Sequence, residues 1–206
     1  MKWLGRGEIA FSLIGVSFVG WALAAIVTTH LYQARQGRAF SDIEHGAAAA
    51  AHGTETPETP AASAATEPFA PARGADPLVL GRIEIPRIGV SAIVREGDDD
   101  ATLAVAVGHI PGTARPGTAG NMALAGHRDS FFRALRLIKV QDTIRIRTAG
   151  GRYEYRVEST EVVQPGETRV LAPTHDAVLT LVTCYPFGWV GAAPDRFIVR
   201  ARLSPQ

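Results

Sequence analysis

The chain has a single cysteine, Cys184, at the end of the apolar, β-branched run Val178–Thr183. Such a run is typical of a buried strand, and Pro186 ends it, so the thiol is expected at a strand tip. One cysteine cannot form an intramolecular disulfide. Cys184 is therefore either a small buried hydrophobic residue or a reactive thiol, and only its neighbours can distinguish the two.

Arg196 is the first of these neighbours. It opens the run Arg196–Leu203, which alternates partly between apolar and charged residues and is expected to be the last strand. If this strand pairs antiparallel with Val178–Thr183, its start lies beside the end of its partner. Cys184 and Arg196 would then meet at one rim of a sheet, joined by a Gly- and Pro-containing loop over 185–195. Alone, an arginine in this position is usually a solvated charge.

His127 is the second neighbour. It follows Gly126 after the apolar run Met122–Ala125, which is expected to be a strand. His109 also follows a glycine, and local chemistry does not separate the two histidines. Either one alone is more often a turn or core residue than a catalytic group.

Taken together, these residues resemble the signature of the sortases, which are membrane-anchored cysteine transpeptidases. The signature comprises a T-L-x-T-C strand, here Thr180-Leu-Val-Thr-Cys184, a histidine after the fourth strand and an arginine opening the last strand. The segments 108–112 and 120–132 are most similar to class D-like sortases, including those of Gram-negative bacteria. The resemblance covers about 78–203 and implies a closed eight-stranded β-barrel.

The resemblance also implies a role for each site residue. Cys184 would attack the carbonyl of a threonine–glycine bond in a sorting signal, because a thiolate is a strong nucleophile. His127 would protonate the departing amine and deprotonate the incoming one. Arg196 would hydrogen-bond the substrate backbone or the developing oxyanion. Thr183 is a further candidate for positioning substrate, with a plain β-forming role as the alternative.

No cofactor and no metal site is expected. Asp98–Asp100 is explained as the N-terminal cap of a short helix over 101–107. Asp129 could orient His127, but a turn-forming aspartate is the better explanation. The chain lacks Cys-x-x-Cys, His-Glu-x-x-His and a Gly-rich phosphate loop. With a net charge of +1 and no basic stripe, nucleic acid is not expected as a partner.

The N-terminus is expected to anchor the protein in a membrane. Ile9–Thr29 is a run of 21 residues without a charged side chain, long enough to cross a bilayer as a helix. Lys2 and Arg6 precede it and favour a cytoplasmic N-terminus. A cleaved signal peptide, with Ala22-Leu-Ala24 as the small-x-small site, is the alternative. We assign 1–36 to a cytoplasmic stub, transmembrane anchor and membrane-proximal segment, with the catalytic domain on the extracytoplasmic or periplasmic side of the bacterial cytoplasmic (inner) membrane.

Two further regions complete the predicted organisation. Residues 37–77 are rich in Ala, Pro, Thr and Glu, which indicates a flexible linker. Residues 78–206 are expected to form one mainly β catalytic domain. Within it, Thr143–Arg147 and Tyr153–Val157 flank a glycine turn and predict a hairpin, and 131–139 predicts a short helix.

The predicted function is therefore that of a sortase with two partners, an exported protein carrying a C-terminal sorting signal and an amine acceptor from the cell envelope or a protein. A sorting-signal protease that uses water as acceptor is one alternative. A non-enzymatic, membrane-tethered β-barrel binding domain is another. L,D-transpeptidases also use an exported cysteine, but they are expected to carry Ser-His-Gly-Cys, whereas this chain has Leu-Val-Thr-Cys184.

Overall fold

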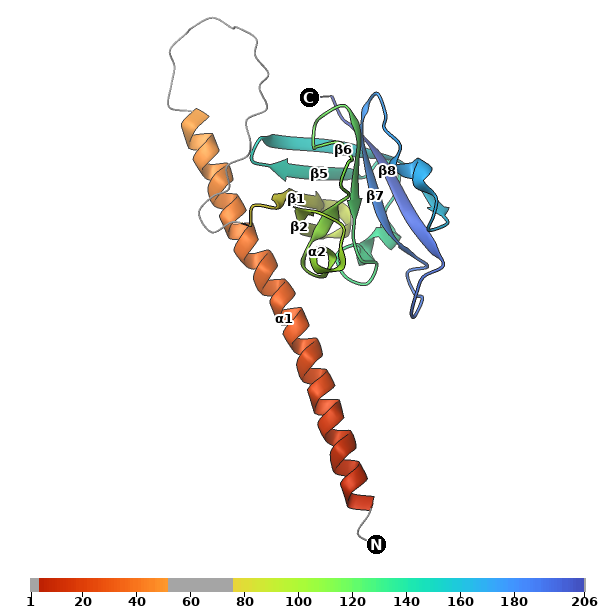
Figure 1. Cartoon of the computed structure of the whole chain (residues 1–206). Coiled ribbons are helices and arrows are strands. Elements are labelled where there is room, and N and C mark those ends of the chain that lie inside the picture. The colour runs from red at the N-terminus through yellow and green to blue at the C-terminus, as the bar shows by residue number, and fades with distance from the viewer. Residues whose placement is uncertain (1–3, 52–75, 206) are drawn as a thin grey trace, which may run out of the picture.

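A long N-terminal helix lies against a β-barrel in the computed structural model, which describes residues 4–51 and 76–205 (Figure 1). The helix α1 spans Leu4–Ala51. Eight strands follow it: β1 (Val79–Ile85), β2 (Val90–Glu96), β3 (Val107–His109), β4 (Gly120–Ala125), β5 (Thr143–Thr148), β6 (Gly151–Val163), β7 (Ala177–Tyr185) and β8 (Asp195–Leu203). They close in the order β1-β2-β3-β4-β7-β8-β6-β5. The predicted closed eight-stranded barrel with short helices is confirmed.

Side chains alternate between the inside and the outside of the barrel along each strand. Leu179 and Leu181 of β7, with Val199 and Ala201 of β8, point into the main core and are fully buried. Residues of the opposite parity, such as Val182 and its partner Ile198, pack in a second, smaller cluster outside the barrel. This alternation decides which face of the sheet each site residue occupies.

Four short helices connect the strands, and two of them differ from the predicted ones. The segment expected to be helical over 101–107 forms α2 (Asp100–Val105), which ends earlier because Val107–His109 pairs with β2 and β4 as β3. Instead of a helix over 131–139, the chain forms the 3-10 helix η2 (Arg133–Leu137). The other two are η1 (Pro86–Ile88) and η3 (Thr168–Leu171).

The predicted hairpin is β5 and β6, which pair from Thr143↔Arg156 to Thr148↔Gly151. Strand β6 continues beyond the expected Val157 to Val163, because its second half pairs with β8. A register shift between Val157 and Ser159 marks the change of partner.

Helix α1 continues further than the membrane-proximal segment predicted to end at residue 36. Residues 37–51 are helical, and the rest of the predicted linker up to residue 75 lies outside the described residues. The Gln33 amide bonds the barrel twice, accepting from Ile93 N (2.9 Å) and donating to Val105 O (2.6 Å). The Tyr32 hydroxyl donates to Asp76 Oδ2 (2.8 Å) where the chain enters the barrel. The barrel is thus in direct contact with α1.

Candidate active site

Cys184 and Arg196 lie directly opposite each other on β7 and β8. Both side chains are partly exposed. Two residues earlier on β7, Val182 points outside the barrel, so Cys184 shares the outer face, as does Arg196 two residues before Ile198. Directly opposed residues of an antiparallel pair have Cβ atoms about 4.5–5.5 Å apart. The predicted adjacency of Cys184 and Arg196 at one rim is therefore present in the fold.

His127 follows β4, the strand that flanks β7 on the side opposite β8. Strand β4 runs parallel to β7, with Ala125 opposite Val182, so two residues further on His127 stands level with Cys184. The main chain keeps this register beyond the strand, because Gly126 N donates to Val182 O at 3.1 Å. The His127 carbonyl accepts from Phe132 N at 3.0 Å, which closes the following turn and leaves the His127 side chain exposed.

Thr183 lies on the other face of the sheet from Cys184 and Arg196. It is 2% exposed and points into the barrel, and its hydroxyl donates to the Gly126 carbonyl at 2.7 Å. The side chain thus fastens β7 to the residue before His127. This contact supports a positioning role through the main chain, not direct contact with substrate.

The Arg196 guanidinium is oriented by the chain that precedes it. Its Nη1 donates to Asp195 O (2.9 Å) and to Ala193 O (3.4 Å). An arginine has five donor hydrogens in a planar fork. Both of these bonds use Nη1, so the guanidinium is held to the main chain through one of its three nitrogens.

Arg128 is a residue that the sequence did not identify as part of the site. Its Nη2 donates to Trp189 O (2.8 Å) and Gly191 O (2.9 Å), which ties the segment after His127 to the loop between β7 and β8. Its Nη1 is buried and has no hydrogen-bond partner among the described residues. Its place directly after His127 was the only available signal, since the accepting carbonyls lie more than sixty residues away.

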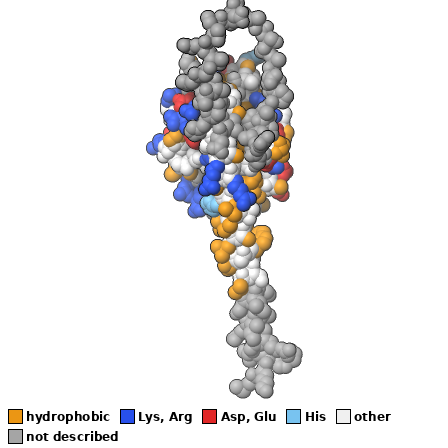
Figure 2. Space-filling model, turned by 90° about the vertical axis from the view of Figure 1, so that its left-hand side faces the viewer, with side chains coloured by type: hydrophobic (Ala, Val, Ile, Leu, Met, Phe, Trp, Pro, Cys, Tyr) orange, Lys and Arg blue, Asp and Glu red, His pale blue; other side chains and the backbone are white. Residues whose placement is uncertain are grey.

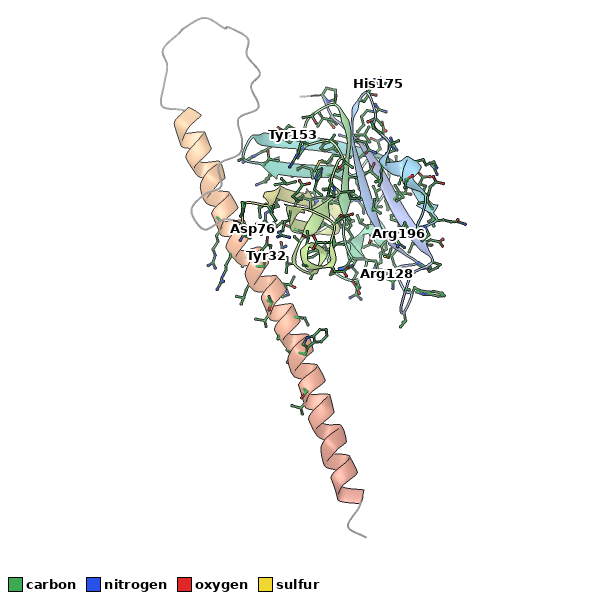
Figure 3. The ribbon with its side chains drawn as sticks, viewed as in Figure 1. Tyr32, Asp76, Arg128, Tyr153, His175 and Arg196 are labelled. Carbon is green, nitrogen blue, oxygen red and sulfur yellow. The ribbon has the colours of Figure 1, made fainter. Side chains whose placement is uncertain are left out.

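The position of the site in the barrel is visible from the side chains. Arg128 and Arg196 lie in the half of the barrel nearer the N-terminal end of α1, and Tyr153 and His175 lie in the opposite half (Figure 3). Three aromatic rings, those of Tyr185, Phe187 and Phe197, pack together beside the rim, with ring centroids 5.3–6.1 Å apart. They give the site an apolar edge next to its polar groups.

The structure distinguishes His109 from His127 by their burial, which the sequence alone could not do. His109 is 1% exposed and is hydrogen-bonded through both ring nitrogens. Nδ1 lies 3.1 Å from Glu96 Oε2, and Nε2 lies 3.0 Å from Ala114 O. His109 therefore cross-links the β2–β3 region, whereas His127 is exposed at the rim.

The aspartates considered for a metal have a local structural role. Asp99 caps α2, because its Oδ1 accepts from Ala101 N (3.0 Å) and Thr102 N (3.1 Å). Within residues 4–51 and 76–205, no group of three or more His, Cys, Asp or Glu side chains is arranged to hold a metal ion. The candidate groups at the rim are a thiol, an imidazole and a guanidinium.

Comparison with known proteins agrees with this geometry. The sortase domain model matches residues 83–204. A sortase D of Bacillus subtilis is 35% identical over 120 residues, which make up 58% of this chain and 61% of that protein. A sortase A of Listeria monocytogenes is 33% identical over 110 residues, or 52% of this chain and 49% of that protein. The chain thus spans less than two-thirds of either curated relative.

Solved structures give the same result. The structure of a Clostridium perfringens sortase D5 transpeptidase is similar, with a TM-score of 0.57 and 33% identity over 62% of this chain and 79% of that one. A lid mutant of Corynebacterium diphtheriae sortase A gives a TM-score of 0.58 and 32% identity over 62% and 71% of the two chains. With a family model that matches more than half of its residues, the chain belongs to the sortase family and resembles its class D-like members.

Proposed function

We propose that this protein is a membrane-anchored cysteine transpeptidase that cleaves a Thr–Gly-type bond in the C-terminal sorting signal of an exported protein. It would transfer the acyl group to an amine acceptor of the cell envelope or of another protein. The observation that supports the proposal is the strand pairing around β7: Cys184 lies opposite Arg196 of β8, and β4 pairs with β7 up to Ala125↔Val182, two residues before His127.

The proposed reaction has two halves. The Cys184 thiolate attacks the threonine carbonyl carbon, and Arg196 donates hydrogen bonds to the oxyanion that forms. His127 gives a proton to the departing glycine amine as the C–N bond breaks, which leaves a thioester on Cys184. An incoming amine then attacks the thioester and gives its proton to His127. The new amide bond forms as the Cys184 thiolate leaves.

Anchoring by α1 is supported by its exposed apolar surface. The structure has one helix segment, Gly15–Ala39, that is long and apolar enough to cross a membrane within the described part of the chain. Large apolar side chains around this segment are more than half exposed, among them Val16, Trp21, Leu23 and Ile26. A helix that is apolar on all sides is stable when a bilayer surrounds it. The barrel would then lie on the extracytoplasmic side.

The test uses the full chain in detergent with a library of Leu-Pro-x-Thr-Gly-type peptides. Intact mass spectrometry is expected to detect a thioester adduct on Cys184, and added amines should convert it to an amide. Cys184→Ala should form no adduct. Arg196→Lys should lower kcat/KM by about 100- to 1,000-fold, the usual cost of losing an oxyanion donor. Arg200→Lys, four residues further along β8, is the matched control and should stay near wild type.

The outcomes separate the alternative functions. An adduct that is lost only to water would indicate a sorting-signal protease. Product formation by Cys184→Ala would contradict the proposed nucleophile. The absence of any adduct across the library, with ordinary thiol reactivity, would favour a binding domain.

A further inference from the structure

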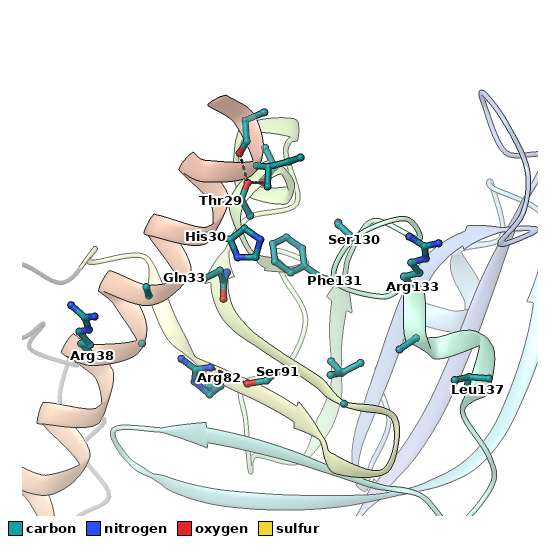
Figure 4. A pocket seen from close by; sticks show the side chains of 18 of the residues that line it. Thr29, His30, Gln33, Arg38, Arg82, Ser91, Ser130, Phe131, Arg133 and Leu137 are labelled. Atoms are coloured by element: carbon teal, nitrogen blue, oxygen red, sulfur yellow. Dashed lines mark hydrogen bonds between the residues drawn. The ribbon is translucent and has the colours of Figure 1, made fainter. Parts of the chain in front are cut away.

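A groove lies between α1 and the barrel, and Cys184, His127 and Arg196 are not among its lining residues (Figure 4). It encloses about 1160 Å³. One wall is the stretch of α1 from Ala25 to Ser41. The opposite wall is formed by the β1–β2 corner, including Arg82 and Ser91, and by the segment from Ser130 to Leu137.

The groove is strongly basic. Five cationic or titratable basic side chains line it: His30, Arg38, Arg82, Arg133 and Arg136. No aspartate or glutamate is among the described lining residues. None of the four arginines forms an ion pair in the part of the chain that the structure describes. In a chain of net charge +1, this local excess of positive charge is not explained by composition.

One of these arginines is fixed in place by its surroundings. The Nη1 of Arg82 donates to the Ser91 hydroxyl at 2.9 Å, and its guanidinium lies against the main chain of α1 at Gly37. A side chain at Gly37 would occupy the space that the Arg82 guanidinium fills. The helix and the barrel therefore approach closely here around a positive charge.

The groove is apolar toward the N-terminal part of α1. Ile26 is 55% exposed on α1, and Phe131 of the facing segment lies beside His30 (Figure 4). In the space-filling view, basic side chains gather directly beyond the apolar stretch of α1 (Figure 2). The groove thus joins a basic region to an apolar one along the same helix.

Its position along α1 coincides with the end of the predicted membrane span. Ala25 and Ile26 belong to the uncharged run that ends at Thr29, and Arg38 lies twelve residues beyond Ile26. At 1.5 Å per residue, that separation is about 18 Å along the helix axis. The headgroup region of one leaflet is only about 5–8 Å thick, so a groove of this length extends from the upper acyl chains past the level of the phosphates.

We infer that this groove binds the headgroup of an anionic phospholipid in the leaflet beside the barrel. Arginine guanidinium groups bind phosphate oxygens with two parallel hydrogen bonds, and Ile26 and Phe131 would lie along the upper acyl chains. The inference rests on the proposed anchoring by α1. It does not involve Cys184, His127 or Arg196.

The test is a titration of the full chain in an uncharged detergent, followed by native mass spectrometry. The ligands are dioctanoyl phosphatidylglycerol, dioctanoyl phosphatidylcholine and glycerol phosphate. We expect a 1:1 complex with phosphatidylglycerol that is tighter than with either other ligand. The double variant Arg133→Gln/Arg136→Gln should weaken it about thirtyfold, from the usual contribution of two basic residues near an anionic membrane. The control Arg156→Gln/Arg169→Gln removes the same charge from exposed positions in β6 and η3 and should stay within about twofold.

Several results would overturn the inference. These are equal affinity for the two phospholipids, glycerol phosphate binding as tightly as phosphatidylglycerol, or an equal loss in the control variant. Circular dichroism and Cys184 adduct formation on the same preparations report whether the variants fold and react. Recovery of the chain in the soluble fraction of cells would refute anchoring alone, and failure of adduct formation would refute the transpeptidase alone. Both are distinguishable from a failure of lipid binding.

Discussion

At the residue scale, a single buried hydrogen bond connects two parts of the proposed site. The Thr183 hydroxyl, next to Cys184 in sequence, donates to the carbonyl of Gly126, next to His127. The proposed nucleophile and the proposed acid–base residue are therefore each one residue away from the same contact. Small displacements of catalytic groups reduce rates strongly, so this contact is expected to affect turnover.

Replacing Thr183 with valine removes the hydroxyl while keeping the β-branched shape. We expect Thr183→Val to lower kcat at least tenfold with little change in KM, because the geometry of the reacting groups changes and the substrate contacts do not. The free energy of unfolding should fall by about 1 kcal/mol, the net value of one hydrogen bond. Steady-state kinetics and denaturant unfolding measure the two effects. Thr183→Ser keeps the hydroxyl and should recover most of kcat, and a failure of this rescue would contradict the positioning role.

The sequence allowed some of these residue positions to be predicted. Cys184 and Arg196 were placed together because two neighbouring strands with a short loop between them leave little choice of register. His127 was preferred to His109 only through the family resemblance, since burial decides between them and burial is not readable from a single residue. The Arg128 contacts with Trp189 and Gly191 could not be predicted, because they depend on how two loops approach in space.

At the element scale, the turn before β5 depends on one carboxylate. Asp142 is 8% exposed, bonded by the Arg87 guanidinium and by Lys139 N at 2.8 Å. The hydrogen bond from Arg87 is the main influence, and with the Lys139 N–H and the nearby positive charges it outweighs desolvation and lowers the pKa of Asp142. This turn also contains Gln141, which adopts φ 74°, a conformation that an isolated glutamine disfavours. The carboxylate therefore stabilises an otherwise unfavourable turn.

The lowered pKa predicts an acid-dependent stability. A depressed folded-state pKa contributes stability that is present above the ordinary value of 3.8 and is lost as pH falls through the folded value. Asp142→Asn should lower the melting temperature by roughly 5 °C at neutral pH. This difference from wild type should shrink as pH falls below 3.8.

Thermal unfolding followed by circular dichroism between pH 7 and pH 2.5 measures this difference. Asp98→Asn, at an exposed position before α2, is the control and should show no such pH dependence. If the difference in melting temperature between Asp142→Asn and wild type stays constant from pH 7 to pH 2.5, the proposed dependence of stability on Asp142 ionisation is contradicted.

The elements that were predicted well are those with strong local signals. The β5–β6 hairpin has alternating residues around a glycine turn, and α2 has a capping aspartate. The extension of β6 to Val163 and the short strand β3 were missed, because both exist through pairing with strands that are distant in sequence. The 3-10 form of η2 likewise depends on packing of Leu135 in the barrel core.

At the scale of the whole molecule, α1 completes the barrel at a place where strand pairing is interrupted. Strand β3 pairs with β2 only over Val94–Glu96, so the rest of this edge of β2 lacks a neighbouring strand. The Gln33 side chain accepts from Ile93 N there and donates to Val105 O. An uncovered strand edge is open to unwanted pairing, and α1 protects it.

Removing this amide should expose the edge of β2. We expect Gln33→Leu to increase the hydrogen-exchange rate of the Ile93 amide about fivefold, the equivalent of one net hydrogen bond. Exchange of the full chain in detergent, followed by mass spectrometry at peptide resolution, measures it. Arg35→Ala changes an exposed residue of the same helix and should have no effect on Ile93. Unchanged exchange in Gln33→Leu would show that the barrel protects this edge without α1.

The direct contact between α1 and the barrel also has a consequence for substrate choice. The rim with Cys184 lies in the half of the barrel nearer the N-terminal end of α1. If α1 spans the membrane, the nucleophile faces the bilayer at a fixed height, and a substrate must present its scissile bond at that height while both proteins diffuse in the same plane. The spacing between the sorting motif and the substrate's own membrane segment would then act as a selection criterion that is independent of the motif itself. Substrates with the correct motif but a spacer that is a few residues too short would remain uncleaved.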